Sequence, residues 1–149
     1  MDRERWFDRT FVFDLPLGRF PFILERLRGM PVRAEEKVRG VGRDLHTRRL
    51  NDTWSIQENL GHLIDLEALH MRRLDELAAL AEAGRPTGDL PVLAPADLEN
   101  RATWEANHNV RSIEEVLRDL RRGRTAFVAR LESWDPARLD VAGIHPRLK

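Results

Sequence analysis

One histidine of this chain stands between two carboxylates at helical spacing. The stretch from Trp54 to His70 reads WSIQENLGHLIDLEALH, and it places Glu58 four residues before His62 and Asp65 three residues after it. Residues so spaced lie on neighbouring turns of a helix, so both carboxylates can approach the imidazole. Such an imidazole can take part in an ordinary ion-pair ladder, or it can bind a metal ion while a carboxylate orients its ring.

Spacing alone favours the ion-pair ladder over the metal site. The chain contains no H-x-x-x-H or H-E-x-x-H motif that would give His62 a second ligand. His70 lies eight residues on, about 12 Å along a helix axis, which is too far to share an ion with His62. His46 is expected on the surface of a loop. His108, in EANHN, is interpreted either as a polar cap of a loop or as a pocket residue.

Other kinds of active site find no support in the sequence. The chain has no cysteine, which excludes disulfides, thiolate metal sites and a cysteine nucleophile. It also lacks the G-x-S-x-G motif of serine hydrolases and a glycine-rich loop that could cradle phosphate. The arginines of RRGR, residues 121–124, are interpreted as the solvated face of a helix.

The helix that carries His62 has clear ends. Ser55 and Glu58 form an S-x-x-E capping box, and the apolar pattern then continues from Ile56 to about residue 83, where glycine and proline follow. On a helical wheel most of the apolar residues gather around Leu60, and His62 lies about 160° away from it. Residues 66 and 69 are leucines beside His62, so the helix is apolar on two faces, as expected of an interior or interface-forming helix.

The other elements are helical as well. Residues 20–41 predict a helix that Gly29 and Pro31 break into two pieces. A second S-x-x-E box, Ser112 to Glu115, begins a helix that ends near residue 134, and a short helix is expected between residues 97 and 108. Leu45 and the leucine at position 50 are expected to close one end of the bundle. The sequence therefore predicts one all-α domain over residues 1–149, an antiparallel bundle with long connections.

Composition narrows the choice of partners and compartment. Lys+Arg 25 balance Asp+Glu 25, so no net field draws the chain to nucleic acid or to an anionic membrane, and we expect neither partner. The N-terminal MDRERWFDRTFVF has no apolar core of a signal peptide, and no stretch approaches the length of a membrane span. A cytoplasmic protein is the expectation.

Several segments together resemble the DinB superfamily, whose YfiT-like members are regarded as metal-dependent enzymes. WSIQENLGHLIDLE is similar to the signature of the family's second helix. FPFILERLRGMPVRAEEKVRG, ADLENRATWEANHN and the final HPRL are similar to further family segments in the same order, so the resemblance extends from about residue 16 to residue 148.

The resemblance implies a four-helix bundle of up-down-down-up topology, frequently a homodimer, with a divalent metal, commonly Zn or Ni, held by three histidines at one end. His62 stands where the family has its first ligand, and Glu58, Asp65 and His108 become residues that could orient this ligand or line the pocket. Related proteins include S-transferases that use bacillithiol, mycothiol or glutathione as the thiol, and a mycothiol-dependent isomerase. The implied substrates are thus a small thiol and a small electrophile.

The chain departs from the family pattern after HPRL. The family's other two ligands come from an H-x-x-x-H in the last helix, and this sequence ends at Lys149, where that helix would begin. We therefore expect the last helix and two of the three ligands to be missing from this chain. The alternative to an enzyme is a non-catalytic bundle that has lost its metal site and serves as a ligand-binding or dimerisation module.

Overall fold

The structure is a computed structural model that describes residues 8–12, 14–51, 53–84 and 89–147. The charged start of the N-terminus, part of the proline-containing connection after residue 84 and the last two residues of the HPRLK tail lie outside these ranges. The elements in chain order are η2 (Leu17–Arg19), α1 (Phe20–Arg28), α2 (Met30–Arg39), η3 (Arg43–Leu45), α3 (Ile56–Ala83), α4 (Arg101–Ala106), η4 (His108–Val110), α5 (Ile113–Glu132) and η5 (Pro136–Arg138).

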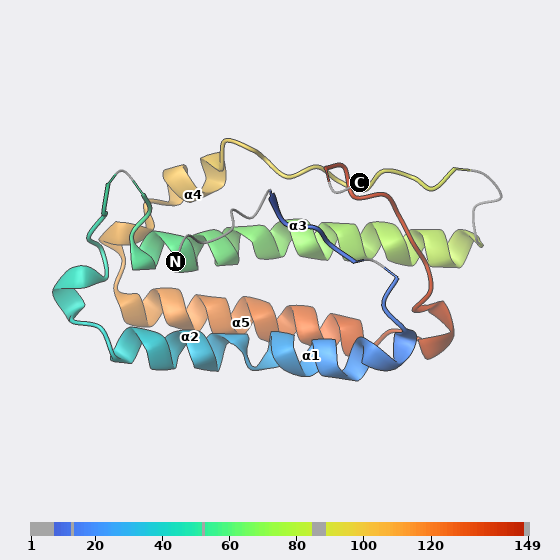
Figure 1. Cartoon of the computed structure of the whole chain (residues 1–149), viewed down its shortest axis with the longest axis horizontal. Coiled ribbons are helices and arrows are strands. Elements are labelled where there is room, and N and C mark those ends of the chain that lie inside the picture. Colours follow the sequence, from blue (N-terminus) through green and yellow to red (C-terminus); the bar gives the residue numbers. More distant parts are fainter. Residues whose placement is uncertain (1–7, 13, 52, 85–88, 148–149) are drawn as a thin grey trace.

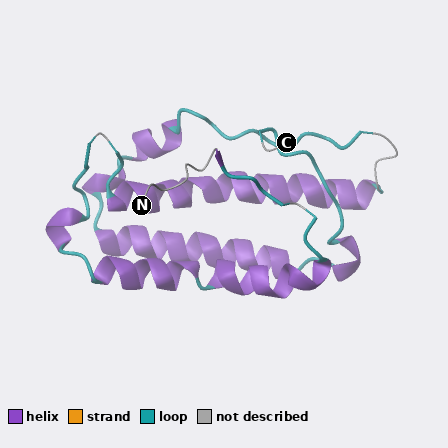
Figure 2. Ribbon diagram, viewed as in Figure 1, coloured by secondary structure: helices purple, strands orange, loops and turns teal. Residues whose placement is uncertain are grey.

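Three long rods form the body of the protein (Figure 1). α3 packs along α5, and α1 and α2 follow one another end to end along the other side of α5. The described ranges contain no strand and, after α5, no fourth long helix (Figure 2). The predicted all-α class is therefore confirmed. None of the helices in these ranges combines the length and apolar character needed to cross a bilayer.

The core lies where α2, α3 and α5 meet. Val116 and Leu120 of α5 are fully buried there, against Leu60 of α3 and Val38 of α2. The apolar stripe that surrounds Leu60 in the sequence thus faces this core. The break between the two halves of the first rod occurs as predicted, since α1 ends before Gly29 and Pro31 stands in the first turn of α2.

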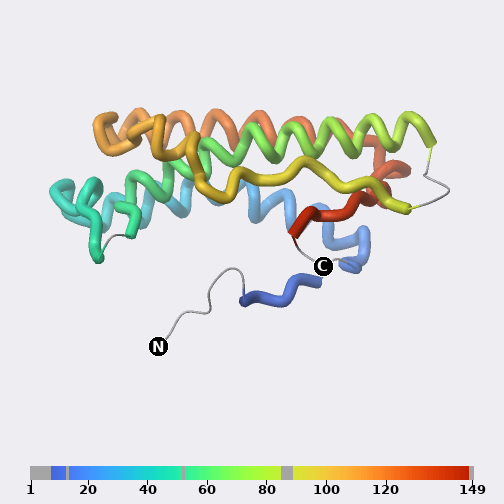
Figure 3. The backbone as a smooth tube through the Cα atoms, turned by 90° about the horizontal axis from the view of Figure 1, so that it is seen from above, coloured from blue at the N-terminus to red at the C-terminus, as the bar shows by residue number. Residues whose placement is uncertain are grey.

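The other apolar face of α3 is covered by an extended segment, residues 89–100, that we call the strap. It runs back along α3 from the far end of the helix toward α4 (Figures 1 and 3). The backbone N–H of Ala94 donates to Glu76 Oε2 at 2.8 Å, and its carbonyl accepts from Arg73 Nε at 2.8 Å. The strap also pairs with the C-terminal segment through an isolated parallel bridge between Val92 and Ile144. Side chains of α3 and the last described residues together hold the strap in place.

Three local predictions about the burial of side chains are wrong. His46 is buried, since its Nε2 lies 3.3 Å from the carbonyl oxygen of Val38 and 3.2 Å from that of Val41 at the end of α2. The two leucines expected to close the bundle, Leu45 and Leu50, are instead exposed. The solvated face assigned to RRGR ends before Arg124, which is buried against α3.

Both capping boxes form as predicted. Ser55 Oγ accepts the backbone N–H of Glu58 at 3.0 Å, and Glu58 Oε2 accepts the backbone N–H of Ser55 at 2.9 Å. The guanidinium of Arg49 also forms an ion pair with the Glu58 carboxylate, and its Nε donates to Oε2 at 2.9 Å. This ion pair fixes the loop before α3 to the first turn of the helix.

The Arg49–Glu58 ion pair predicts a defined loss of stability in acid. Hydrogen bonding to Arg49 lowers the pKa of Glu58 from 4.5 to about 2, so the unfolded chain binds more protons between these values. A shift of this size corresponds to about 3 kcal/mol, and we expect roughly 1–2 kcal/mol because solvent screens the half-exposed Arg49. The stability advantage of the wild type over Glu58→Gln should be complete above pH 4.5 and disappear as the pH falls toward about 2.

Urea unfolding of both proteins across this pH range measures the difference. Glu115→Gln is the matched control, because Glu115 occupies the same position in the second capping box, and its hydrogen bonds come from Ser112 rather than from an arginine. A difference between wild type and Glu58→Gln that does not change with pH would contradict the assignment.

A buried ion pair between α3 and α5 gives a second stability prediction. Arg124 Nε donates to Glu67 Oε1 at 2.6 Å, and both side chains are buried. Arg124→Met removes the guanidinium that hydrogen-bonds to the buried Glu67 carboxylate, so we expect the free energy of unfolding to fall by about 3 kcal/mol. Arg122→Met, at an exposed position two residues away, should change it by less than about 0.5 kcal/mol. Equal urea midpoints for the two variants would show that the pair is not needed.

A close approach at Gly61 gives a third prediction. A Cβ atom at this position would overlap the ring of His108, which is itself buried. Gly61→Ala must therefore displace η4 from α3, and we expect it to cost about 2–3 kcal/mol, which thermal unfolding can measure. Gly123→Ala in α5 is the control, because its Cβ would meet Glu67 Cγ at an ordinary 3.4 Å and alanine favours the helix. Comparable melting temperatures for the two variants would exclude the close contact.

Candidate functional site

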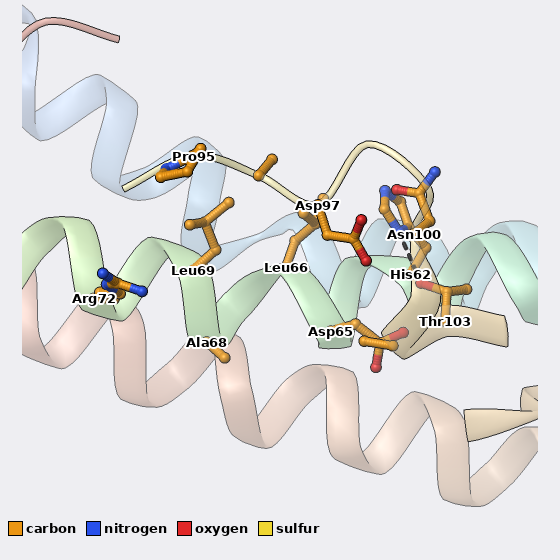
Figure 4. A pocket seen from close by; sticks show the side chains of 12 residues that line it. His62, Asp65, Leu66, Ala68, Leu69, Arg72, Pro95, Asp97, Asn100 and Thr103 are labelled. Carbon is orange, nitrogen blue, oxygen red and sulfur yellow. Dashed lines mark hydrogen bonds between the residues drawn. The ribbon is translucent and has the colours of Figure 1, made fainter. Parts of the chain in front are cut away.

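His62 lies half-buried between α3 and α4. Its Nδ1 is 3.0 Å from the hydroxyl oxygen of Thr103, which is buried on α4 (Figure 4). The ring of Trp54 packs on the imidazole with 4.7 Å between ring centroids, and Trp104 of α4 meets Trp54 edge-on at 5.8 Å. These contacts fix the orientation of the imidazole.

The surroundings of His62 favour its neutral form. Burial lowers the pKa of the imidazole, and this effect prevails over the opposing charge of Asp65. When Nδ1–H donates to Thr103, Nε2 carries a free lone pair. No hydrogen bond to Nε2 is made by any residue that the structure describes. A neutral imidazole held through one nitrogen is the form in which histidine binds a metal ion or accepts a proton.

Asp65 and His108 form a second unit next to His62. His108 Nε2 lies 3.0 Å from Asp65 Oδ2, and because an ionised carboxylate only accepts, Nε2 carries the proton. The sequence left His108 as a polar loop cap or a pocket residue, and in the structure it is 2% exposed and is a buried partner of Asp65. Gln57 Nε2 fixes this partner by donating to the carbonyl oxygens of His108 and Arg111, at 2.5 and 2.7 Å.

The ion-pair ladder favoured by spacing is absent. Glu58 is occupied by Arg49 and by the capping box, and Asp65 is occupied by His108. Neither carboxylate hydrogen-bonds to His62, whose partner is Thr103 instead. The sequence grouped Glu58, Asp65 and His108 with His62, and the structure brings Asp65 and His108 to its vicinity while Glu58 serves the helix start.

A groove of about 310 Å³ runs along α3 away from His62. Its floor includes Leu66 and Leu69, the two leucines on the second apolar face of α3, and the strap forms its wall (Figure 4). Arg72 stands at the opposite end from His62. The lining residues are His62, Asp65, Leu66, Ala68, Leu69, Arg72, Pro95, Ala96, Asp97, Asn100, Ala102 and Thr103.

Sequence reasoning missed the contributions of Thr103, Arg72 and the strap to this groove. Thr103 reaches His62 from 41 residues away, and no local pattern marks such a contact. The turns on either side of α4 could have been found from their asparagines. Asn100 and Asn107 both adopt positive φ, at 53° and 44°, a conformation that asparagine tolerates better than most residues. These turns bound α4 and aim it at His62.

The described residues do not complete a metal site. Within those ranges no three His, Asp or Glu side chains are grouped so that they could hold one ion. Asp65 and Asp97 share the groove with His62, but Asp65 is bonded to His108, and Asp97 accepts the backbone N–H groups of Glu99 and Arg101 at 3.0 and 2.8 Å. His62 therefore offers one donor nitrogen, and its role as a metal ligand stays a prediction.

Comparison with solved structures reveals the same fold in another protein. The chain is similar to YfiT from Bacillus subtilis, described as a probable metal-dependent hydrolase with an unusual four-helix bundle topology. The TM-score is 0.65 at 15% sequence identity, and the similarity covers 93% of this chain and 74% of YfiT. At this identity the likeness shows the fold alone, and it confirms the predicted DinB-like bundle.

Sequence comparisons assign the family. No curated protein matches the chain significantly. The sequence profile of the DinB superfamily matches residues 26–149, which include α2 to α5, His62 and the whole groove. Because this match spans well over half of the sequence, the chain belongs to the DinB superfamily.

Proposed function

We propose that this protein is a metal-dependent enzyme that acts on small molecules bound in the α3 groove, with His62 as a ligand of a divalent ion such as Zn or Ni. The observation that carries the proposal is the state of His62: a neutral, oriented imidazole with one nitrogen held by Thr103 and the other without a partner among the described residues. Superfamily membership and the description of YfiT as a probable metal-dependent hydrolase also support a metal-dependent function.

The described residues do not supply the rest of a ligand set for this ion. What these residues do supply is a binding site. Leu66, Leu69 and Pro95 offer apolar surface to a substrate, while Thr103 and Trp54 hold the imidazole at the end of the groove. A mostly apolar cleft with a few fixed polar groups is typical of small-molecule sites.

A finer version of the proposal is a thiol S-transferase that joins a small thiol, such as bacillithiol, mycothiol or glutathione, to a small electrophile. Its support is the resemblance of the WSIQENLGHLIDLE segment to the superfamily signature. A cytoplasmic homodimer belongs to the same proposal. Several large apolar side chains are exposed on the first rod and just before it, as an association surface would require; they are Leu15, Leu17, Phe22 and Val32.

A second candidate function is a non-catalytic binding module. The observation that favours it is the missing three-donor cluster within the described ranges. In this version His62 and the groove bind a small ligand without a metal, and the bundle dimerises or serves a partner. Metal content separates the two candidates.

The metal proposal predicts stoichiometric binding that depends on His62. Protein expressed from the complete reading frame and equilibrated with Zn²⁺ or Ni²⁺, then desalted, should retain about one ion per chain in elemental analysis. His62→Ala should retain essentially none, because it removes a ligand nitrogen and the site loses affinity. Circular dichroism of the variant establishes that the helices persist.

His70→Ala is the control, because His70 lies on the same helix outside the groove and contacts Glu67 at 3.7 Å and Phe127. It should retain as much metal as the wild type. A wild-type protein without bound metal, or a His62→Ala variant with an undiminished metal content, would contradict the proposal. The non-catalytic binding module would then be the candidate function that stands.

A further inference from the structure

The groove carries opposite charges at its two ends. Among the described residues that line the groove, Arg72 is the only lysine or arginine, and it stands at the end far from His62 (Figure 4). The carboxylates of Asp65 and Asp97 stand toward the His62 end. Hydrogen bonds from backbone N–H groups, chiefly that of Arg101, lower the pKa of Asp97, so its negative charge persists at neutral pH.

The Arg72 guanidinium is oriented by a chain of contacts that ends on the strap. Its Nε donates to Glu76 Oε1 at 3.1 Å, and the other oxygen of Glu76 accepts the N–H of Ala94. Arg73 holds the carbonyl of the same Ala94. Glu76 thus occupies Nε of Arg72, while no described residue hydrogen-bonds to its two Nη nitrogens. A planar guanidinium fixed at Nε presents these donors in a geometry that suits a carboxylate.

The apolar middle of the groove defines the rest of the ligand. Leu66 and Leu69 lie between His62 and Arg72, and Pro95 of the strap faces them (Figure 4). His62 and Arg72 are ten residues apart on one helix, about 15 Å along its axis, and their side chains shorten the gap. A compound that touches both ends must therefore be elongated, with an apolar body between them.

We propose that the groove binds an elongated small carboxylic acid, with its carboxylate on Arg72, its apolar body on Leu66 and Leu69, and its uncharged end at His62. This proposal rests on the proposed function in that it takes the same groove as the substrate site. In the metal-free protein the charge pattern favours this orientation, because an anionic group at the other end would meet Asp65 and Asp97. A single arginine matches a monoanionic carboxylate better than a phosphate dianion, which calls for more donors.

Three probes of one size and different charge test the proposal: 4-phenylbutyrate, 4-phenylbutanamide and 4-phenylbutylamine. Titrations followed by ¹H–¹⁵N NMR should shift the amides of residues 62–72 and 96–103. We expect the anion to bind about tenfold tighter than the amide, equivalent to about 1.4 kcal/mol, and the amine to bind most weakly. Added salt should reduce the preference, since Arg72 is largely exposed.

Arg72→Gln should abolish the preference for the anion and leave binding of the amide unchanged. Arg122→Gln is the matched control, because Arg122 is a similarly exposed arginine on α5 that pairs with Asp119 outside the groove, and it should behave as the wild type. Equal affinities for the three probes, shifts outside the groove, no binding of the anion, or an anion preference that survives Arg72→Gln would each overturn the proposal.

The probes need no metal, so the two proposals fail separately. A protein that binds no ion but prefers 4-phenylbutyrate through Arg72 would refute the metal-dependent function and support the carboxylate site. A protein that binds metal through His62 but does not discriminate among the probes would do the reverse.

Discussion

The contact between Gly61 and the ring of His108 is the constraint on which the arrangement around the site depends. Since position 61 has no side chain, the buried imidazole can lie directly against the backbone of α3. Gln57, one turn earlier, then donates to the carbonyls of His108 and Arg111 and so fixes η4 at its first residue and at the residue that follows it. A buried ring that also donates to Asp65 leaves η4 little freedom to shift along the helix.

The position of η4 determines where α4 and the strap lie. α4 is only six residues long, and Asn107 in the left-handed conformation connects it to η4. Thr103 is thereby brought to His62, and the residues before α4 must run back along α3, where Ala94 is held by Arg73 and Glu76. The second apolar face of α3 is consequently covered by an extended segment and not by a helix. That covering forms the wall of the groove.

The sequence predicted the features that are local in the chain. The S-x-x-E boxes, the break at Gly29 and the bounds of α3 depend on residues within a turn or two of one another, and all three are confirmed. The partners of the charged side chains were wrong where they come from elsewhere: Glu58 binds Arg49 of the preceding loop, and Arg124 binds Glu67 across the bundle. Helical spacing shows which residues share a face, but it cannot show what packs on that face.

The same distinction explains why the two ends of the groove differ in how readily they were found. His62 stood out because a histidine on an apolar face is unusual, whereas Arg72 is one of many arginines in this sequence. Its significance comes from Glu76, which binds its Nε and the backbone of the strap together. Both ends are carried by one uninterrupted 28-residue helix, so their separation is set by the helical rise and not by the strap. The strap forms the wall between them and contributes Asp97 to the negative charge at the His62 end. In the proposed carboxylate site, the arginine that would bind the anion therefore belongs to α3, whereas residues 89–100 would limit the shape of the ligand and add to the repulsion of a second anionic group.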